Sequence, residues 1–340
     1  NANKYLMGTP AIGNLDDDSD LEVVIGGYSS SNQIYAVNPD GSDVDGFPLI
    51  LGEKTKAGVA LADFNGNGKD DIVVGTDNDN IYLIYDDGSI APGFPFTTGD
   101  KIQAPPSIKE INGEKVIFIG ANDKHFYAIN SDGTLRFSVQ TGDKVQTSPS
   151  ILEHDGENYI FFGSKDKMIY AVDSYGNTLS EEWPIEVNSS IVGSVVFSDL
   201  DGNGEAEFIV AMELGEVAAF HLDGSYYPYF PLANEFPFSG SPMITDLDDD
   251  GDLEILAGSG SNLVVIDIKE MGKSEGYWSE FQGGIDRRGS NSLGGCTNSD
   301  YCNYDSSAIW NDGSCSNKDY ECENGTQGCD CSGVCNGNVI

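Results

Sequence analysis

A unit of about 45 residues recurs along most of the chain, and this repetition limits the possible folds more than any other feature. Each unit combines an apolar run ending in a small residue, a second apolar run, and in most units an Asp-Gly turn with a closing aromatic-Pro step. The second unit has all the parts, as VALADFNGNGKDDIVVGT, NIYLIYDDG and GFP. We count six units, with approximate bounds 7–54, 55–101, 102–144, 145–189, 190–236 and 237–289.

The composition of these units predicts strands. Short runs rich in Val, Ile, Phe and Tyr, separated by Asp-Gly turns, predict consecutive antiparallel hairpins. About four strands per unit at this period are typical of propeller blades. We therefore expect an all-β chain in which residues 1–290 form a six-bladed β-propeller of four-stranded antiparallel blades. A stacked solenoid is the alternative, because periodicity alone does not prove that an array closes into a ring.

Cysteine is confined to the end of the chain, which predicts a second, small domain at 291–340. A dense cysteine segment indicates either a disulfide-rich irregular domain in an oxidising compartment or a zinc site in a reducing one. The tail has no His and no two CxxC pairs, so we favour disulfides and a secreted or cell-surface protein. An odd number leaves one thiol unpaired or bridging to another chain. The seven residues are Cys296, Cys302, Cys315, Cys322, Cys329, Cys331 and Cys335.

The charge of the chain excludes several classes of partner. With 17 basic and 56 acidic residues the net charge is −39, which disfavours nucleic acids and anionic lipid surfaces. Such acidity fits a surface adapted to salty water or carboxylates gathered to bind cations. No apolar run reaches the ~18 residues of a membrane helix, and residues 1–7 lack a charged, apolar leader. We expect a soluble chain without membrane insertion, from which any export signal has been removed.

Four loops place oxygen-bearing side chains at alternate positions between the first two strands of a repeat, as a calcium (Ca2+) site requires. In each loop the fourth of the five residues is expected to provide its backbone carbonyl. We expect about four structural sites, in repeats one, two, five and six. The residues are Asn14, Asp16, Asp18, Asp20 and Glu22; Asp63, Asn65, Asn67, Lys69 and Asp71; Asp199, Asp201, Asn203, Glu205 and Glu207; and Asp246, Asp248, Asp250, Asp252 and Glu254.

Two other interpretations of these loops are weaker. Asp, Asn and Gly also dominate ordinary turns, but four copies in one register favour metal binding. An EF-hand would carry its last carboxylate later and would have flanking helices, so it is rejected. The first site opens with Asn14, lacks one negative charge, and is expected to be the weakest. Repeats three and four have only short turns at this place and are expected to be plain hairpins.

The repeats resemble the bacterial FG-GAP or VCBS-type propeller repeats, similar to those of the integrin α-subunit, over about residues 7–289. That resemblance implies calcium in the hairpin between the first two strands of a blade, which corresponds to the four loops above. Repeats three and four look more like blades of quinoprotein-type propellers. The stretch Tyr277–Gly289 resembles a Trp-containing segment that borders such arrays, and we expect it to help close the ring. Residues 295–315 resemble a Cys-rich repeat of large secreted bacterial proteins, often marine.

The sequence carries none of the common catalytic motifs. The sequence has three His, and no GxSxG elbow, HExxH helix, phosphate loop or dinucleotide fingerprint. We therefore predict that the chain has no catalytic or cofactor-binding residues and is not an enzyme. Paired carboxylates leave glycoside hydrolysis open, and propellers also host sugar lyases and quinone-dependent dehydrogenases.

The combination predicts a binding protein. We expect an extracellular adhesion or surface-assembly module that binds a protein or glycan on a cell surface or in a matrix and self-assembles through its tail. The alternatives are a carbohydrate-binding propeller and a propeller-fold polysaccharide-degrading enzyme. The aromatic cluster YYPYF, at residues 226–230, would be a sugar or protein contact in a lectin, although packing between neighbouring sheets is favoured.

Overall fold

The computed structural model describes residues 5–18, 20–28, 32–290, 294–295 and 310–311. The chain divides into two compact units, residues 1–291 and 292–340. In the second unit, β24 (Gly294–Gly295) pairs in parallel with β25 (Trp310–Asn311). All seven cysteines lie outside the described residues, so the disulfide-rich tail stays a prediction.

The first unit is all-β. Its described residues contain no α-helix and one 3-10 turn, η1 (Phe281–Gly283). Within the described part of the chain, no helix has the length and hydropathy needed to cross a bilayer.

Each of the first five repeats forms one antiparallel four-stranded sheet, with its strands in sequence order. The first two sheets are β1 (Ala11–Gly13), β2 (Glu22–Gly26), β3 (Gln33–Val37) and β4 (Leu49–Ile50), then β5 (Ala60–Ala62), β6 (Asp71–Gly75), β7 (Asn80–Ile84) and β8 (Phe96–Thr97). The third and fourth are β9 (Ser107–Ile111), β10 (Glu114–Gly120), β11 (His125–Asn130) and β12 (Leu135–Gln140), then β13 (Ser150–His154), β14 (Glu157–Gly163), β15 (Met168–Asp173) and β16 (Ile185–Glu186). The fifth is β17 (Val196–Ser198), β18 (Glu207–Ala211), β19 (Glu216–His221) and β20 (Leu232–Ala233).

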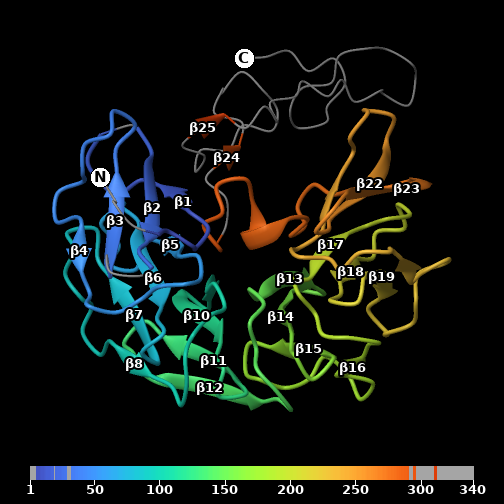
Figure 1. Ribbon diagram of the computed structural model, residues 1–340, viewed down its shortest axis with the longest axis horizontal. Coiled ribbons are helices and arrows are strands. Elements are labelled where there is room, and N and C mark those ends of the chain that lie inside the picture. The colour runs from blue at the N-terminus through green and yellow to red at the C-terminus, as the bar shows by residue number, and fades with distance from the viewer. Residues whose placement is uncertain (1–4, 19, 29–31, 291–293, 296–309, 312–340) are drawn as a thin grey trace, which may run out of the picture. The chain divides into compact units, whose positions relative to one another are not determined.

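These sheets fan around a common centre with their first strands innermost, which is the arrangement of a β-propeller (Figure 1). Successive side chains of a strand point to opposite faces, so a sheet between two neighbours is buried on both. Every residue of β6 and of β18 is buried accordingly. Five hydrophobic clusters join neighbouring sheets, from the first with the second to the fifth with the sixth.

The sixth sheet differs from the prediction of four strands. In the described residues it has three, β21 (Met243–Thr245), β22 (Asp252–Gly258) and β23 (Leu263–Met271). No described strand pairs with the outer edge of β23, where every other sheet has a fourth strand. Leu263, Val265 and Met271 on β23 are exposed by 62%, 47% and 67%.

The first and sixth sheets share none of the five hydrophobic clusters found in the described residues. Ile12 and Val23 on the first sheet are exposed, whereas strand β6 at the corresponding place of the second sheet is buried throughout. Each of these two sheets therefore has one neighbour instead of two, and the predicted ring is not closed by a hydrophobic contact between them.

A segment that follows β23, residues 273–290, hydrogen-bonds to the innermost strands from the centre. It includes the Tyr277–Gly289 stretch that we expected to help close the ring. Backbone amides of five sheets donate to its carbonyls, and η1 lies next to β13 of the fourth sheet. The bonds are Phe197 to Trp278 (2.9 Å), Ile244 to Ser279 (2.9 Å), Ile12 to Asp286 (2.8 Å), Leu61 to Arg288 (2.8 Å) and Ile108 to Gly289 (2.6 Å). The segment thus connects the first sheet with the sixth.

Two buried polar side chains anchor this segment. Arg288 forms an ion pair with Asp70 and donates to the carbonyl of Leu61 at 3.4 Å. Burial raises the pKa of Asp70, and the neighbouring guanidinium opposes the rise. Gln282 donates to the carbonyl of Val59 at 2.9 Å. Removing one partner of a buried polar pair lowers the stability of the fold, because the other partner stays buried without compensation.

We predict that Arg288→Met lowers the free energy of unfolding by about 3–5 kcal/mol, because it leaves the Asp70 carboxylate buried and unpaired. Lys115→Met is the control, since it breaks the surface pair of Lys115 with Glu110 at 3.8 Å and is expected to cost about 0–1 kcal/mol. Urea unfolding followed by tryptophan fluorescence measures both. Equal, small losses in the two variants would contradict the anchoring role of Arg288.

Candidate metal centres in the blade hairpins

The four acidic hairpins share one strand register. In each, the residue before the loop pairs with the last predicted ligand, which is the first residue of the second strand or lies near its start. This register places the last carboxylate beside the start of the loop, so that the intervening residues must curl back. The pairs are Gly13 with Glu22, Ala62 with Asp71, Ser198 with Glu207 and Thr245 with Glu254.

The last carboxylate closes every loop in the same way. One of its oxygens accepts a hydrogen bond from the backbone amide seven residues earlier, and all four side chains are buried. The other oxygen is therefore left for a different partner. The four bonds run from Leu15 to Glu22 (2.6 Å), Phe64 to Asp71 (2.8 Å), Leu200 to Glu207 (2.8 Å) and Leu247 to Glu254 (2.6 Å).

Three of the loops bring carboxylate oxygens within 4.8 Å of one another. The groups are Asp16, Asp18 and Glu22; Asp199, Asp201 and Glu207; and Asp248, Asp250, Asp252 and Glu254. Carboxylate and amide oxygens are the ligands of a hard divalent cation such as calcium. The described residues thus present three acidic groups at predicted sites.

The remaining predicted residues take other positions. Asp20 and Glu205, expected to provide carbonyls, are not in these carboxylate groups. Asp252 was also expected to provide its carbonyl, but its carboxylate lies in the sixth-sheet group, and its backbone amide donates to Asp250 Oδ1 at 3.2 Å. Asp246 instead accepts hydrogen bonds from the amides of Asp250 and Gly251.

Asn14 and Asn203 flank the groups. The side-chain oxygen of Asn14 is buried without a hydrogen-bond partner among the described residues, and that of Asn203 accepts from the amide of Glu205 at 2.6 Å. Asn203 therefore helps to fold its loop, whereas the oxygen of Asn14 is left for a ligand.

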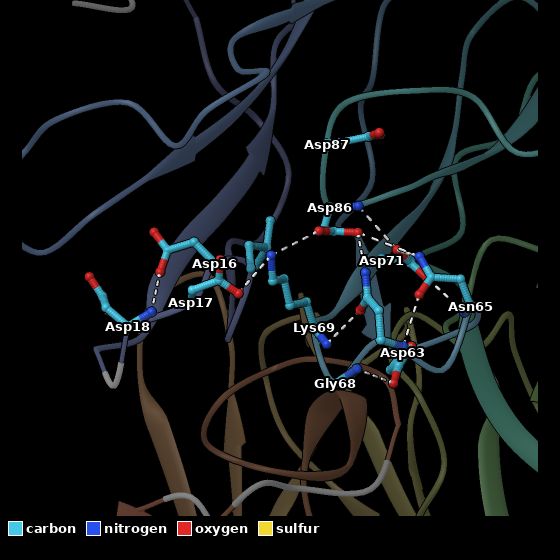
Figure 2. Close-up of polar contacts among 12 residues, drawn as sticks. Asp16, Asp17, Asp18, Asp63, Asn65, Gly68, Lys69, Asp71, Asp86 and Asp87 are labelled. Carbon is cyan, nitrogen blue, oxygen red and sulfur yellow. Dashed lines mark hydrogen bonds and ion pairs between the residues drawn. The ribbon is translucent and has the colours of Figure 1, made fainter.

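The predicted side-chain ligands of the second sheet's loop are the carboxylates of Asp63 and Asp71 and the amides of Asn65 and Asn67. Figure 2 shows Asp63, Asn65 and Asp71. Asp63 accepts from the amides of Gly66, Asn67 and Gly68, and the side chain of Asn65 donates to Asp71 at 3.3 Å. These bonds fold the loop around the side chains predicted to bind calcium.

Lys69 connects two neighbouring acidic hairpins. Its Nζ lies 3.0 Å from Asp17 Oδ1 in the first sheet's loop and 3.6 Å from Asp86 Oδ2 (Figure 2). The prediction assigned Lys69 a role through its backbone carbonyl, and that role leaves its side chain available for these contacts. Asp86 also accepts from the side-chain amides of Asn65 and Asn67 and was missed by the sequence analysis. Its only signal is the acidic pair in the Asp-Gly turn of the same repeat.

The protein supplies little positive charge to the buried carboxylates. Burial, with Asp16, Asp18 and Asp20 adding repulsion, raises the pKa of Glu22 to about 7. Burial likewise raises the pKa of Asp71 to about 7.

The fifth and sixth sheets show the same effect. Burial raises the pKa of Asp252 to about 6 and also raises that of Glu207. His221 Nδ1 lies 3.1 Å from Glu207 Oε1, a contact that the sequence analysis did not anticipate. A cation bound among these oxygens would lower each pKa, because it favours the charged form.

Three of the buried oxygens that lack a hydrogen-bond partner among the described residues lie at the predicted sites. They are Asn14 Oδ1 and Glu22 Oε1 in the first loop and Asp252 Oδ1 in the sixth. Because buried polar atoms are normally satisfied, oxygens of this kind beside a carboxylate group fit the place of a cation. The donor set fits calcium.

The hairpins of the third and fourth sheets have a different geometry. Each is closed by two residues with positive φ, Asn112 and Gly113 (54° and 82°) and Asp155 and Gly156 (52° and 76°). Such a pair forms the tight turn that matches the twist of adjacent strands. These are the short hairpins that the sequence predicts.

Comparison with known proteins supports the fold and the repeat. Residues 14–74, which span the first two acidic loops, match the family model described as an FG-GAP-like repeat. No curated protein sequence matches the chain. The crystal structure of the V. cholerae biofilm matrix protein Bap1 aligns with a TM-score of 0.55 and 18% identity, over 71% of this chain and 42% of that one. The match therefore spans less than half of Bap1.

Two further solved structures are similar. BBS1N, solved in complex with ARL6DN, aligns with a TM-score of 0.51 and 15% identity, over 78% of this chain and 92% of that one. The WD40 beta propeller domain of Doa1 aligns with a TM-score of 0.47 and 16% identity, over 73% of this chain and 75% of that one. At 18% and 15% identity, the similarities to Bap1 and to BBS1N concern the fold alone. Residues 14–74 thus resemble an FG-GAP-like repeat, and they form part of the β-propeller described above.

We predict that Asp248→Asn removes one bound calcium ion per chain, because it takes a carboxylate from the sixth-sheet group. Asp249→Asn is the matched control: Asp249 is the next residue, is exposed, and lies outside that group. Equilibrium dialysis with metal analysis measures the number of ions. Thermal unfolding of the chain in a scanning calorimeter gives a second measurement. Calcium at 100 times its Kd should raise the free energy of unfolding by about 2.7 kcal/mol per site.

An identical number of ions in D248N and the unaltered chain would contradict this assignment. So would an equal loss in D249N, because it would attribute the effect to general surface charge.

Proposed function

We propose that the chain is an extracellular adhesion or surface-assembly module, built on a six-bladed propeller whose hairpins are clamped by calcium, and that it is not an enzyme. The FG-GAP-like match and the acidic groups support the calcium assignment. When bound, the ion supplies positive charge that holds the buried carboxylates together. The four last carboxylates, Glu22, Asp71, Glu207 and Glu254, then fix each loop to its strand through the backbone amides.

The observation that carries the assembly role is the unpaired edge of β23. A long edge strand presents free backbone donors and acceptors, and natural proteins usually cover or charge such edges. This strand instead exposes Leu263, Val265 and Met271, while the neighbouring face of the first sheet exposes Ile12 and Val23. Exposed apolar side chains of this kind mark interaction surfaces.

We propose that a neighbouring copy of the chain covers this edge. Asp267 and Lys269 lie on the same face of β23 as the exposed apolar residues and form an ion pair with each other, so they add no net charge that would repel a second strand of the same sequence. The odd number of cysteines supports a crosslink between copies through the tail. A cell-surface or matrix protein or glycan would then be the external partner.

Carbohydrate binding is the second candidate, and it is favoured by the residues of the YYPYF cluster. Tyr227 packs between the fifth and sixth sheets, as expected, but Tyr229 is 94% exposed. It lines a cavity of about 260 Å³ together with Phe230 and residues of β23. An exposed ring beside an apolar hollow is a surface on which a sugar can stack.

We predict that Leu263→Lys abolishes high-mass species of the purified full chain, because it replaces an exposed apolar side chain of the proposed contact with a charge that would lose its hydration there. Leu214→Lys is the control, since Leu214 is 73% exposed in the fifth repeat and is away from β23. Size-exclusion chromatography with light scattering measures mass, in calcium, in a chelator and in a reductant.

We expect the unaltered chain to form large species that a chelator or a reductant dissociates. L214K should form the same large species. A monomer under all conditions would overturn the assembly role while leaving calcium binding to be judged by the dialysis experiment.

A further inference from the structure

A second cavity, of about 550 Å³, lies where the segments leading into the inner strands of all six sheets converge. Each repeat contributes residues from just before its first strand, and the central segment adds Phe281 and Arg287. Its volume is in the range of small-molecule sites, which is about 300–1,000 Å³. Neither the acidic hairpins nor the edge of β23 contributes to its lining.

The charge of this lining is opposite to that of the protein. The chain carries 56 acidic residues, yet the lining contains no Asp or Glu and has two cations, Lys56 and Arg287. Low-dielectric walls with charges of one sign focus the potential and attract ligands of the other. The lining therefore favours an anionic group over a cationic one.

One side of the cavity is ordered by a chain of amide side chains. Gln146 Nε2 donates to Gln103 Oε1 at 3.0 Å and to Asn122 Oδ1 at 2.8 Å. Gln103 Nε2 donates to Asp77 Oδ1 at 2.9 Å, and Lys56 Nζ lies 3.4 Å from Gln103 Oε1. These bonds hold the two Gln side chains and the ammonium group before any ligand arrives, which lowers the entropy cost of binding.

Arg287 and Ser194 add polar groups elsewhere in the lining. Arg287 Nη1 donates to the carbonyl of Phe281 at 2.8 Å and lies 3.3 Å from Glu280. A guanidinium has five N–H donors, so this residue can hold Glu280 and still donate to a ligand. Ser194 is 1% exposed, and its Oγ has no hydrogen-bond partner among the described residues. Its backbone amide donates to Ser241 Oγ at 2.8 Å.

The geometry points to a binding site for an acidic carbohydrate, with the carboxylate of one uronate unit at Lys56 and Arg287 and its hydroxyls at the amides and serines. Hydroxyls and amides both donate and accept, as sugar hydroxyls do. A phosphate has acceptors only and is usually held by denser cations or a backbone nest. A neutral sugar would favour aromatic stacking, but the single aromatic ring in the lining, Phe281, has the Arg287 guanidinium 5.9 Å from its centroid.

This site does not depend on self-assembly, and its test uses different variants. Lys56→Gln removes one cation, and Lys101→Gln is the control, because Lys101 is exposed and is not part of the lining. Gly240→Leu is the second variant: Gly240 is in the lining, and a Cβ added there meets no atom within 4 Å, so the new side chain begins without a clash. We expect the added side chain to reduce the space for a ligand without removing a charge.

The experiment is isothermal titration of the full chain with trimers of galacturonate, guluronate and glucuronate, and with a neutral galactose trimer. We expect at least one uronate trimer to bind and the neutral one to bind at least tenfold more weakly. K56Q and G240L should each weaken uronate binding at least tenfold, while K101Q leaves it unchanged. Added salt should weaken binding, because the contact includes charge pairs.

The proposal is overturned if none of the three uronate trimers binds, or if the neutral trimer binds equally well. It is also overturned if K56Q and G240L bind the uronate trimer as tightly as the unaltered chain does. Binding of a peptide with a free C-terminal carboxylate, but of no uronate, would assign the cavity to a protein ligand and would also overturn it. Thermal unfolding of each variant checks that the fold is intact.

Discussion

Repulsion between the carboxylates gathered in the blade hairpins is the constraint on which the rest of the structure depends. Four hairpins close in one register by placing a buried carboxylate against the backbone at the start of the loop. The same closure collects acidic side chains within 4.8 Å in three of them. Lys69 relieves part of this repulsion between the first two hairpins. We propose that a divalent cation offsets the remainder.

The first and sixth sheets of the propeller are connected through its centre. Its first and sixth sheets share none of the hydrophobic clusters of the described residues, so burial between sheets does not close the array. The segment 273–290 instead hydrogen-bonds to inner strands on both sides. The sixth sheet, with three described strands, leaves the outer edge of β23 unpaired, and a cavity lies where the segments before the inner strands converge. These two features are the ones on which the proposed assembly and ligand-binding roles rest.

Local patterns predicted most of the fold, and contacts distant in sequence were missed. The Asp-Gly turns and apolar runs predicted the hairpins, and the alternating oxygens of Asp63, Asn65 and Asn67 marked a loop that the structure folds as expected. The absence of a fourth strand in the sixth sheet has a signal in the sequence: LVVIDIK is followed by neither the Asp-Gly turn nor the aromatic-Pro step, and every other unit has at least one of the two. The contacts of His221 and Asp86 depend on how neighbouring strands and turns are placed in register. The cavity is lined by segments of all six repeats, and no single stretch of sequence reveals it.

The central claim is that cations occupy the acidic hairpins, and the most direct measurement is a crystal structure of the full chain grown with a lanthanide in place of calcium. Its anomalous scattering locates each ion independently of the protein atoms. The account predicts peaks in the hairpins of the first, second, fifth and sixth sheets, with the weakest at Asn14, and each peak coordinated by the last carboxylate of its loop. Ordered hairpins without anomalous peaks would contradict it.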